Sequence, residues 1–380
     1  MRMKKLMILA VAAIGLVACS KTFEVNTTEG SPIGFGTWAN VMSKAESRVQ
    51  GTNIFLSGDT FNVYGYKTVS TTSTNVFDGD VVRAKGATAG DGLAVTAWEY
   101  SPLRFWDPTA SSYTFFAVSP SGKIATAPTA DGTGEYTGLF TSNVITFTGH
   151  DNDVLVATKK VVTAYSSTPV QIQFNHAASL IDVNVKKDAA MPAGATLKIT
   201  AASIIGVQNA GTFTVNHYDG TSLEPVIGTT DWGWAIDGSS TATTYTSTAT
   251  PVTVSAATTE YNGETHVGTT TGTPQDLFTS FVLMPQDLSA GAQKLHLEYK
   301  IVTREATELV SEIATSYTAE VDIKNFVVTD KNNNDAAAVS TSWDPATHYT
   351  YTVTIGANAI NFTASINPWT NKTSYYYIVR

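Results

Sequence analysis

Apolar and polar side chains alternate one by one through many short segments of this chain, and this pattern constrains the fold more than any other feature. The clearest alternating segments are 170–174, 181–186, 294–301, 349–355 and 360–366. A period of two places the apolar side chains on one face of an extended strand. Beyond the N-terminal apolar run, no segment shows a convincing helical period. We therefore predict an all-β chain of antiparallel strands whose apolar faces pack together as β-sandwiches.

The length of 380 residues suits two domains of ordinary size better than one. One alternating strand ends at Phe174 and the next begins at Leu180, with a short small-residue turn between them. We place the boundary in this turn, which predicts one domain over 20–175 and a second over 176–380.

Two stretches in the second half, 238–250 and 265–273, are rich in Thr, Ser and Gly. This composition is typical of loops or flexible hairpin ends. Residues 20–30 are polar and are interpreted as a tether.

The N-terminus carries a basic start, an apolar run from Leu6 to Val17, and then Ala18 and Cys19. The run is too short to span a bilayer and has the features of a bacterial secretory signal that is cut at a cysteine. The end of this signal resembles a lipobox, so residues 1–19 are predicted to be a lipoprotein signal peptide. Acyl chains on Cys19 would then hold the mature protein to a membrane. The alternative is a short membrane anchor with an incidental cysteine.

Several classes of function find no support in the composition. Charged residues make up 14% of the chain, the net charge is −9 and the pI is near 5.1, a balance that argues against nucleic acid as a partner. The six histidines show no metal-ligand spacing, no Gly-x-Ser-x-Gly elbow occurs, and the only cysteine is Cys19. We expect no catalytic residue, no metal site and no cofactor.

Two tryptophans, Trp232 and Trp234, flank a glycine after Asp231. Paired indole rings in a loop could stack on a sugar, but core aromatics at the end of a strand explain the same residues equally well. A glycan contact at Trp232 and Trp234 therefore stays open as one of two interpretations.

Several segments together resemble the fimbrillin-like lipoproteins of Bacteroidales, the subunits of type V pili. The resemblance is carried by segments 58–66, 103–108, 113–120, 153–157, 174–183, 281–286 and 349–353, together with Trp369. It implies two transthyretin-like β-sandwich domains in tandem and export through the periplasm to the outer membrane. It also implies assembly with other fimbrillin subunits into an adhesive surface fimbria, after an arginine-specific protease removes the N-terminal segment. A strand from a neighbouring subunit would then fill the groove that the lost strand leaves.

The resemblance directs attention to two segments near the N-terminus. Residues 33–38 are the candidate for the strand that is lost, and 41–48 for the loop that is cut. Arg48 is the only arginine between Arg2 and Arg83, so it is the predicted cleavage site. The alternative is that Arg48 is an ordinary surface residue.

The candidate donor strand is the C-terminal segment 374–380, in which Tyr375, Tyr377 and Val379 share one face. The segment is short for a stalk subunit, and a tip subunit that only accepts a strand would tolerate such an ending. The rival hypothesis is a surface glycan-binding β-sandwich lipoprotein. An enzyme has no supporting constellation of residues.

Overall fold

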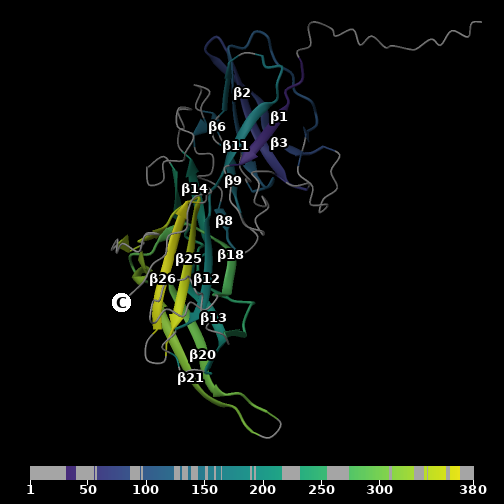
Figure 1. Ribbon diagram of the computed structural model, residues 1–380. Coiled ribbons are helices and arrows are strands. Elements are labelled where there is room, and N and C mark those ends of the chain that lie inside the picture. Colours follow the sequence, from purple (N-terminus) through teal and green to yellow (C-terminus); the bar gives the residue numbers. More distant parts are fainter. Residues whose placement is uncertain are drawn as a thin grey trace, which may run out of the picture.

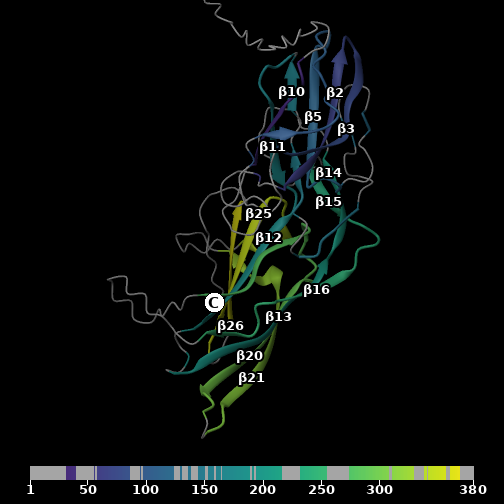
Figure 2. The same cartoon turned by 90° about the vertical axis from the view of Figure 1, so that its right-hand side faces the viewer.

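A computed structural model confirms that the chain is all-β. The only helical element among the described residues is one turn of 3-10 helix, η1 (Ile323–Asn325). The described residues are 31–39, 55, 58–85, 95, 97–123, 129–130, 136–137, 144–149, 153–157, 160–163, 165–188, 191, 194–215, 232–254, 274–307, 310–328, 338–339, 341–356 and 360–368. The molecule is elongated, with the strands of the N-terminal part at one end and those of the C-terminal part at the other (Figures 1 and 2).

The N-terminal part is built on one eight-stranded sheet. Across the sheet the order is β1 (Phe35–Ala39), β11 (Val170–His176), β9 (Leu155–Ala157), β5 (Ser112–Ser119), β2 (Thr60–Val69), β3 (Thr72–Ala84) and β4 (Trp98–Glu99), with β10 (Lys160–Thr163) paired to β5. The ring of Phe35 on β1 contacts the ring of Phe77 on β3, although these strands lie near opposite ends of the sheet order. The sheet therefore curls until its two ends approach each other.

The curled sheet encloses the first apolar cluster. Its buried members include Ile33, Phe35, Phe61, Phe77, Trp106, Phe115, Phe147, Ile172, Phe174, Leu180, Phe213, Val282 and Met284. The last four come from the second half of the chain, so that half also contributes to this core.

Two sheets form the C-terminal part. The first has the order β18 (Gln275–Leu283), β12 (Ser179–Lys187), β25 (Thr347–Ile355), β26 (Ile360–Pro368), β22 (Val327–Val328) and β23 (Ala338–Val339). The second has the order β16 (Ala242–Thr246), β13 (Thr196–Gln208), β20 (Lys294–Arg304) and β21 (Ile313–Asp322), with β17 (Val252–Val254) paired to β13.

These two sheets share the second apolar cluster, which lies between them. Its buried members include Ile181, Val183, Leu197, Ile204, Tyr245, Phe278, Phe281, Leu297, Tyr299, Trp343, Tyr349, Tyr351 and Val353. The predicted alternation of β20 and β25 is observed, since their apolar residues are buried and the residues between them are more exposed. Residues 238–250, predicted as a loop or a flexible hairpin end, contain strand β16, which pairs with β13.

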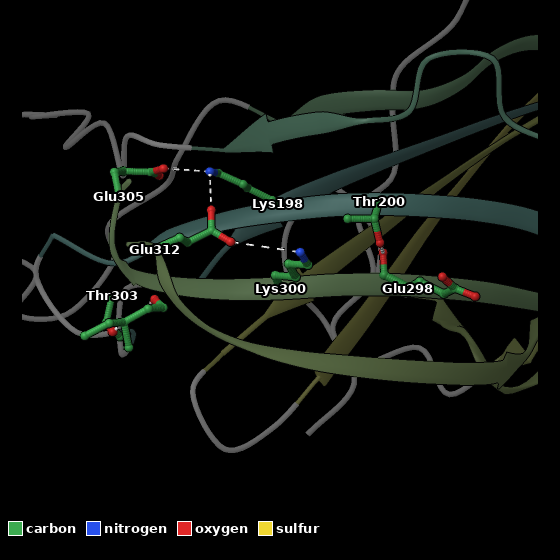
Figure 3. A network of polar contacts seen from close by, with 8 residues as sticks. Lys198, Thr200, Glu298, Lys300, Thr303, Glu305 and Glu312 are labelled. Atoms are coloured by element: carbon green, nitrogen blue, oxygen red, sulfur yellow. Dashed lines mark hydrogen bonds and ion pairs between the residues drawn. The ribbon is translucent and has the colours of Figure 1, made fainter. Parts of the chain in front are cut away.

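Strands β20 and β21 form a hairpin whose loop end extends beyond the rest of their sheet (Figures 1 and 2). Figure 3 shows the ion pairs at the ends of its closing loop: Lys198 Nζ lies 2.6 Å from Glu305 Oε2 and 3.0 Å from Glu312 Oε2. Glu312 Oε1 lies 3.9 Å from Lys300 Nζ. The bond to Glu305 is the main cause of the raised pKa of Lys198, and the same bond lowers the pKa of Glu305. Because these charged groups reach solvent, the ion pairs contribute little to the stability of the fold.

A short link joins the two parts of the chain. Strand β11 ends at His176 and β12 begins at Ser179, so Asn175, His176 and Ser179, predicted to lie in a turn, are strand residues instead. Only Ala177 and Ala178 remain between the strands, and both are fully buried.

A smaller sheet lies beside this link. It has the order β15 (Trp232–Ile236), β14 (Ala210–Val215) and β8 (Val144–Thr146). Two further strand pairs complete the described fold, β19 (Gln286–Asp287) with β24 (Ser342–Trp343) and β6 (Thr129–Ala130) with β7 (Tyr136–Thr137).

The strand pairing departs from the prediction in direction. Most pairs are antiparallel, but β1 with β11, β12 with β25 and β22 with β26 are parallel. Alternation along a strand reports which face is buried and carries no information about the direction of its neighbour, so these parallel pairs could not be predicted from it.

Candidate functional site: the closing segment

Residues 31–39, which we call the closing segment, complete the curled sheet of the N-terminal part. They include β1 and the whole of the predicted removable strand, 33–38. In Figure 1 strand β1 runs along β11 at the edge of the sheet. The segment makes main-chain contacts on two sides, each with a different part of the chain.

On one side the closing segment pairs with β11. The pairing is parallel and in register from Phe35 opposite Val170 to Ala39 opposite Phe174. Just before the strand, the amide of Val170 donates to the carbonyl of Gly34 at 2.7 Å. Strand β11 has β9 on its other side, so β1 supplies one of its two neighbours.

On the other side the start of the closing segment meets residues 104–106. The amide of Ile33 donates to the carbonyl of Arg104 at 2.9 Å, and the amide of Trp106 donates to the carbonyl of Ser31 at 3.0 Å. Pro32 and Phe105 form an antiparallel bridge between these two bonds. The closing segment therefore connects β11 with the chain that follows β4.

Two side chains of the closing segment enter the first apolar cluster, because Ile33 is 1% exposed and Phe35 is 5% exposed. Burial of an aliphatic or aromatic side chain of this size contributes about 1.5–3 kcal/mol. The ring of Phe35 lies 5.4 Å from Phe77, 5.8 Å from Phe115, 6.2 Å from Phe61 and 5.6 Å from Tyr100, measured between centroids. These distances are typical of edge-to-face and tilted aromatic pairs.

Tyr100 is the polar member of this aromatic group. Its hydroxyl donates to the carbonyl of Ile33 at 2.6 Å, and the amide of Arg104 donates to the same hydroxyl at 3.3 Å. Burial is the main cause of the raised pKa of Tyr100, so the phenol stays protonated and remains a donor. The hydroxyl therefore holds the backbone of the closing segment, whatever side chains that segment carries.

Most other predicted site residues lie outside the described part of the chain. Cys19, Arg48, Tyr375, Tyr377 and Val379 are in this group. Their roles stay predictions.

The two tryptophans of the predicted glycan contact lie on β15, and the side chain of Trp232 is outside the described residues. The ring of Trp234 packs 5.2 Å from Phe147 and 5.0 Å from Phe213. Its Nε1 donates to the carbonyl of Ala177 at 2.6 Å. These contacts of Trp234 lie within the protein, and the glycan contact at Trp232 and Trp234 stays a prediction.

The described residues contain no group of three or more His, Cys, Asp or Glu side chains that could hold a metal ion. In the same ranges, no helix has the length and apolar character needed to cross a membrane.

Sequence reasoning identified the closing segment but missed its neighbours. The partner residues 104–106 show no alternating pattern, so nothing marked them as one edge of the site. The aromatic residues around Phe35 come from β2, β3 and β5, and their order along the chain does not show that they converge. A useful signal was Gly65, a glycine between two tyrosines within strand β2, because a glycine inside a strand often marks close packing.

Comparisons with known proteins agree with this architecture. A family model described as fimbrillin-like matches residues 47–369. A fimbrial protein from Bacteroides vulgatus has a similar structure, with a TM-score of 0.52 at 17% identity over 89% of this chain and 99% of that one.

Two further solved structures from Parabacteroides distasonis match more weakly. A proposed cell adhesion protein gives a TM-score of 0.48 at 12% identity over 91% of this chain and 99% of that one. A fimbrial assembly protein gives 0.39 at 10% identity over 90% and 99%. No curated protein matches the sequence.

Proposed function

Because this chain belongs to the fimbrillin-like family, we propose that it is a structural subunit of an adhesive surface fimbria that polymerises by strand exchange. It would be exported through the periplasm as a lipoprotein anchored to the outer membrane by Cys19. Of its two domains, 20–175 would lose the residues up to Arg48 on maturation, and 176–380 would enter the fibre whole. Its partners are other fimbrillin subunits and an arginine-specific protease.

The observation that carries this proposal is the position of the closing segment. It lies at a sheet edge, supplies main-chain partners on two sides and buries Ile33 and Phe35. Its departure would leave unpaired backbone groups and uncovered apolar side chains along one groove. A strand from another subunit would satisfy both at once, which is the physical basis of β-strand addition.

The closing segment precedes Arg48 in the chain. A cut after Arg48 would break the connection between this segment and the rest of the protein, and the lipid on Cys19 would leave with it. The lipid would then serve delivery to the membrane, whereas a subunit that keeps Cys19 would be an anchor or an unassembled precursor. The strand that this chain donates to a neighbouring subunit would be segment 374–380, through Tyr375, Tyr377 and Val379.

The family also indicates a protein without catalysis. The rival hypothesis is a surface glycan-binding lipoprotein that uses Trp232 and Trp234. The described contacts of Trp234 do not support it, because they lie within the protein. Affinity electrophoresis in polysaccharide gels separates the two hypotheses. If polysaccharide retains the wild-type protein but not Trp232→Ala, and the protein forms no polymer, the glycan-binding hypothesis would replace the fimbrial proposal.

The direct test is N-terminal sequencing of the protein recovered from sheared cell surfaces. We expect the assembled form to begin at Val49. Polymers should appear on gels as a ladder of bands that heating abolishes, and Arg48→Gln should block both the cut and this ladder. Arg83→Gln is the matched control, because Arg83 lies on β3 and pairs at the surface with Glu99 at 3.1 Å. Recovered fibres that still contain Cys19 would contradict the maturation step. Ladders that persist after deletion of 374–380 would remove the donor assignment.

A further inference from the structure

We propose that the space filled by Phe35 is a selectivity pocket for the incoming strand. The pocket takes a phenylalanine that lies two residues from an aliphatic side chain, and it discriminates against tyrosine. The preferred donor is therefore a strand of a different subunit that carries this pair. This inference rests on the proposed function, since it requires the closing segment to leave.

The walls of the pocket do not depend on the closing segment. Phe61, Phe77 and Phe115 are each 0% exposed and come from the adjacent strands β2, β3 and β5. Phe77 and Phe115 also contact each other, at 6.1 Å between centroids. These rings are held by the sheet, so we expect the pocket to keep its shape after Phe35 departs.

Gly65 lies under the pocket and sets the position of two walls. It is directly opposite Phe77 on one neighbouring strand and Phe115 on the other. A Cβ atom at Gly65 would lie 3.0 Å from the nearest ring atom of each. Both rings therefore lean over the glycine and enclose the space that Phe35 fills.

The described rings around Phe35 offer no free partner for a phenolic hydroxyl. Phe61, Phe77 and Phe115 carry no polar side-chain atom. The hydroxyl of Tyr100 already donates to the carbonyl of Ile33 and accepts from the amide of Arg104. Any incoming strand supplies an equivalent carbonyl, so this bond supports binding without selecting a side chain.

The cost of a buried hydroxyl without a partner sets the expected selectivity. An unpartnered buried hydroxyl costs about 1–3 kcal/mol. At about 1.4 kcal/mol per tenfold change in affinity, this cost weakens binding about 5- to 150-fold. A smaller side chain would lose the ring contacts and leave a cavity, and we expect it to bind more weakly still.

The spacing of the recognised pair follows from Ile33 and Phe35, which point inward two residues apart in extended chain. The position between them is permissive. A Cβ atom at Gly34 would meet nothing closer than Pro169, at 3.8 Å, which is ordinary contact. The pattern is therefore an aliphatic residue, any residue and then phenylalanine, or the reverse for a strand that runs in the opposite direction.

The chain's own C-terminal segment matches the spacing but not the chemistry. Tyr375, Tyr377 and Val379 alternate as required, yet each ring carries a hydroxyl. A second copy of this chain is therefore a poorer donor than a subunit that presents phenylalanine.

The test uses the full chain after cleavage by an arginine-specific protease and removal of the released fragment. Fluorescently labelled peptides of residues 31–39 are titrated and followed by polarisation, with phenylalanine, tyrosine or alanine at position 35. We expect the phenylalanine peptide to bind most tightly, the tyrosine peptide about 5- to 150-fold more weakly and the alanine peptide most weakly. The control peptide, Gly34→Ala, should bind within about twofold of the native one, because that position is open.

Equal binding of the phenylalanine and tyrosine peptides would overturn the pocket. A closing segment that stays with the protein after cleavage at Arg48 would contradict the proposed function instead. Peptides of residues 373–380, native and Tyr377→Phe, test the choice of partner. We expect the substitution to tighten binding, and a native tail that binds as tightly as residues 31–39 would make a second copy the donor.

A measurement on the uncut chain keeps the pocket testable if the cleaved protein does not stay folded. There Phe35→Tyr should raise the equilibrium constant for unfolding by the same factor, about 5- to 150-fold. An unchanged urea midpoint in this variant would overturn the pocket.

Discussion

At the scale of single residues, two glycines with similar positive φ angles have very different surroundings. Gly206 has φ of +77° and Gly194 has φ of +82°, a region that L side chains rarely adopt. A Cβ atom at Gly194 would meet nothing within 4 Å, whereas one at Gly206 would fall on the carbonyl oxygen of Ala292. The backbone at Ala292 cannot move aside as the end of a long side chain could.

The first prediction compares alanine at these two positions. Gly194→Ala should cost about 1–2 kcal/mol of unfolding free energy, from the positive φ alone. Gly206→Ala should cost about 1–3 kcal/mol more, because the added methyl group must displace backbone. Urea unfolding of both variants measures the difference. Equal midpoints would mean that β13 relaxes around the methyl group and that close packing does not require glycine there.

Asp107 provides a second prediction, on pH. Its carboxylate accepts a hydrogen bond from Lys67 at 2.6 Å and others from Thr109, and these bonds, Lys67 first, hold the pKa of Asp107 well below its ordinary value of 3.8. A carboxyl whose pKa is lowered by folding stabilises the protein above its unfolded pKa and loses this contribution as the pH falls. Asp107→Asn should therefore be less stable than wild type at pH 7, by under about 1 kcal/mol. The gap should narrow as the pH falls below about 4.

Urea unfolding at pH 7, 5, 4 and 3 measures this gap. Lys67→Gln and the double variant complete a cycle that isolates the pair from other effects of the substitutions. A gap that stays constant with pH would show that Asp107 acts through its turn with Thr109 rather than through its charge.

At the scale of strands, the sequence predicts those elements that bury one face evenly. Tyr351 and Val353 on β25 are buried and separated by a more exposed threonine, so the period of two is visible. Strand β16 was missed because only Tyr245 among its five residues is buried, within a run of Thr and Ala. The hydroxyl of Tyr245 donates to the carbonyl of Phe147 at 3.0 Å, a contact that joins distant parts of the chain and leaves no local pattern.

The closing segment illustrates the same limit. Its apolar residues Ile33 and Phe35 were visible in the sequence, and segment 33–38 was singled out on the family resemblance. Its two edges could not be predicted, because parallel pairing with β11 and the contact with residues 104–106 depend on the curl of the sheet. The aromatic pocket depends on the same curl, which brings β1 against residues of β3 and β5.

The third prediction concerns the relative protection of two strands. Strand β25 lies between β12 and β26, whereas β21 is an edge strand whose residues Ile313 and Tyr317 are 48% and 39% exposed. Amides of a central buried strand exchange only through large openings, while those of an exposed edge exchange through local ones. Hydrogen exchange read by mass spectrometry should show peptides from 313–322 labelled at least about tenfold faster than peptides from 347–355. Equal rates would mean that the hairpin opens only together with the sandwich.

At the scale of the whole molecule, the two apolar clusters are joined by more than the two-residue link. Phe213, Val282 and Met284 come from the second half of the chain and lie in the first cluster. Trp234, also from the second half, packs against Phe147 and Phe213 and donates to the carbonyl of Ala177 in the link. The first cluster is therefore incomplete without the residues that follow the link, and its unfolding should be coupled to that of the rest.

The fourth prediction tests this coupling through Trp234. Trp234→Ala should cost about 2–4 kcal/mol, because it removes two ring contacts and leaves the carbonyl of Ala177 without this donor. Since the lost contacts join the second half of the chain to the first cluster, differential scanning calorimetry should show one transition dividing into two, with the calorimetric enthalpy exceeding the van't Hoff value. Trp234→Phe is the control: it keeps a ring against Phe147 and Phe213, and we expect a single transition at a slightly lower temperature. If Trp234→Ala also shows one transition, merely shifted, then Val282, Met284 and the buried alanines of the link suffice to couple the two clusters.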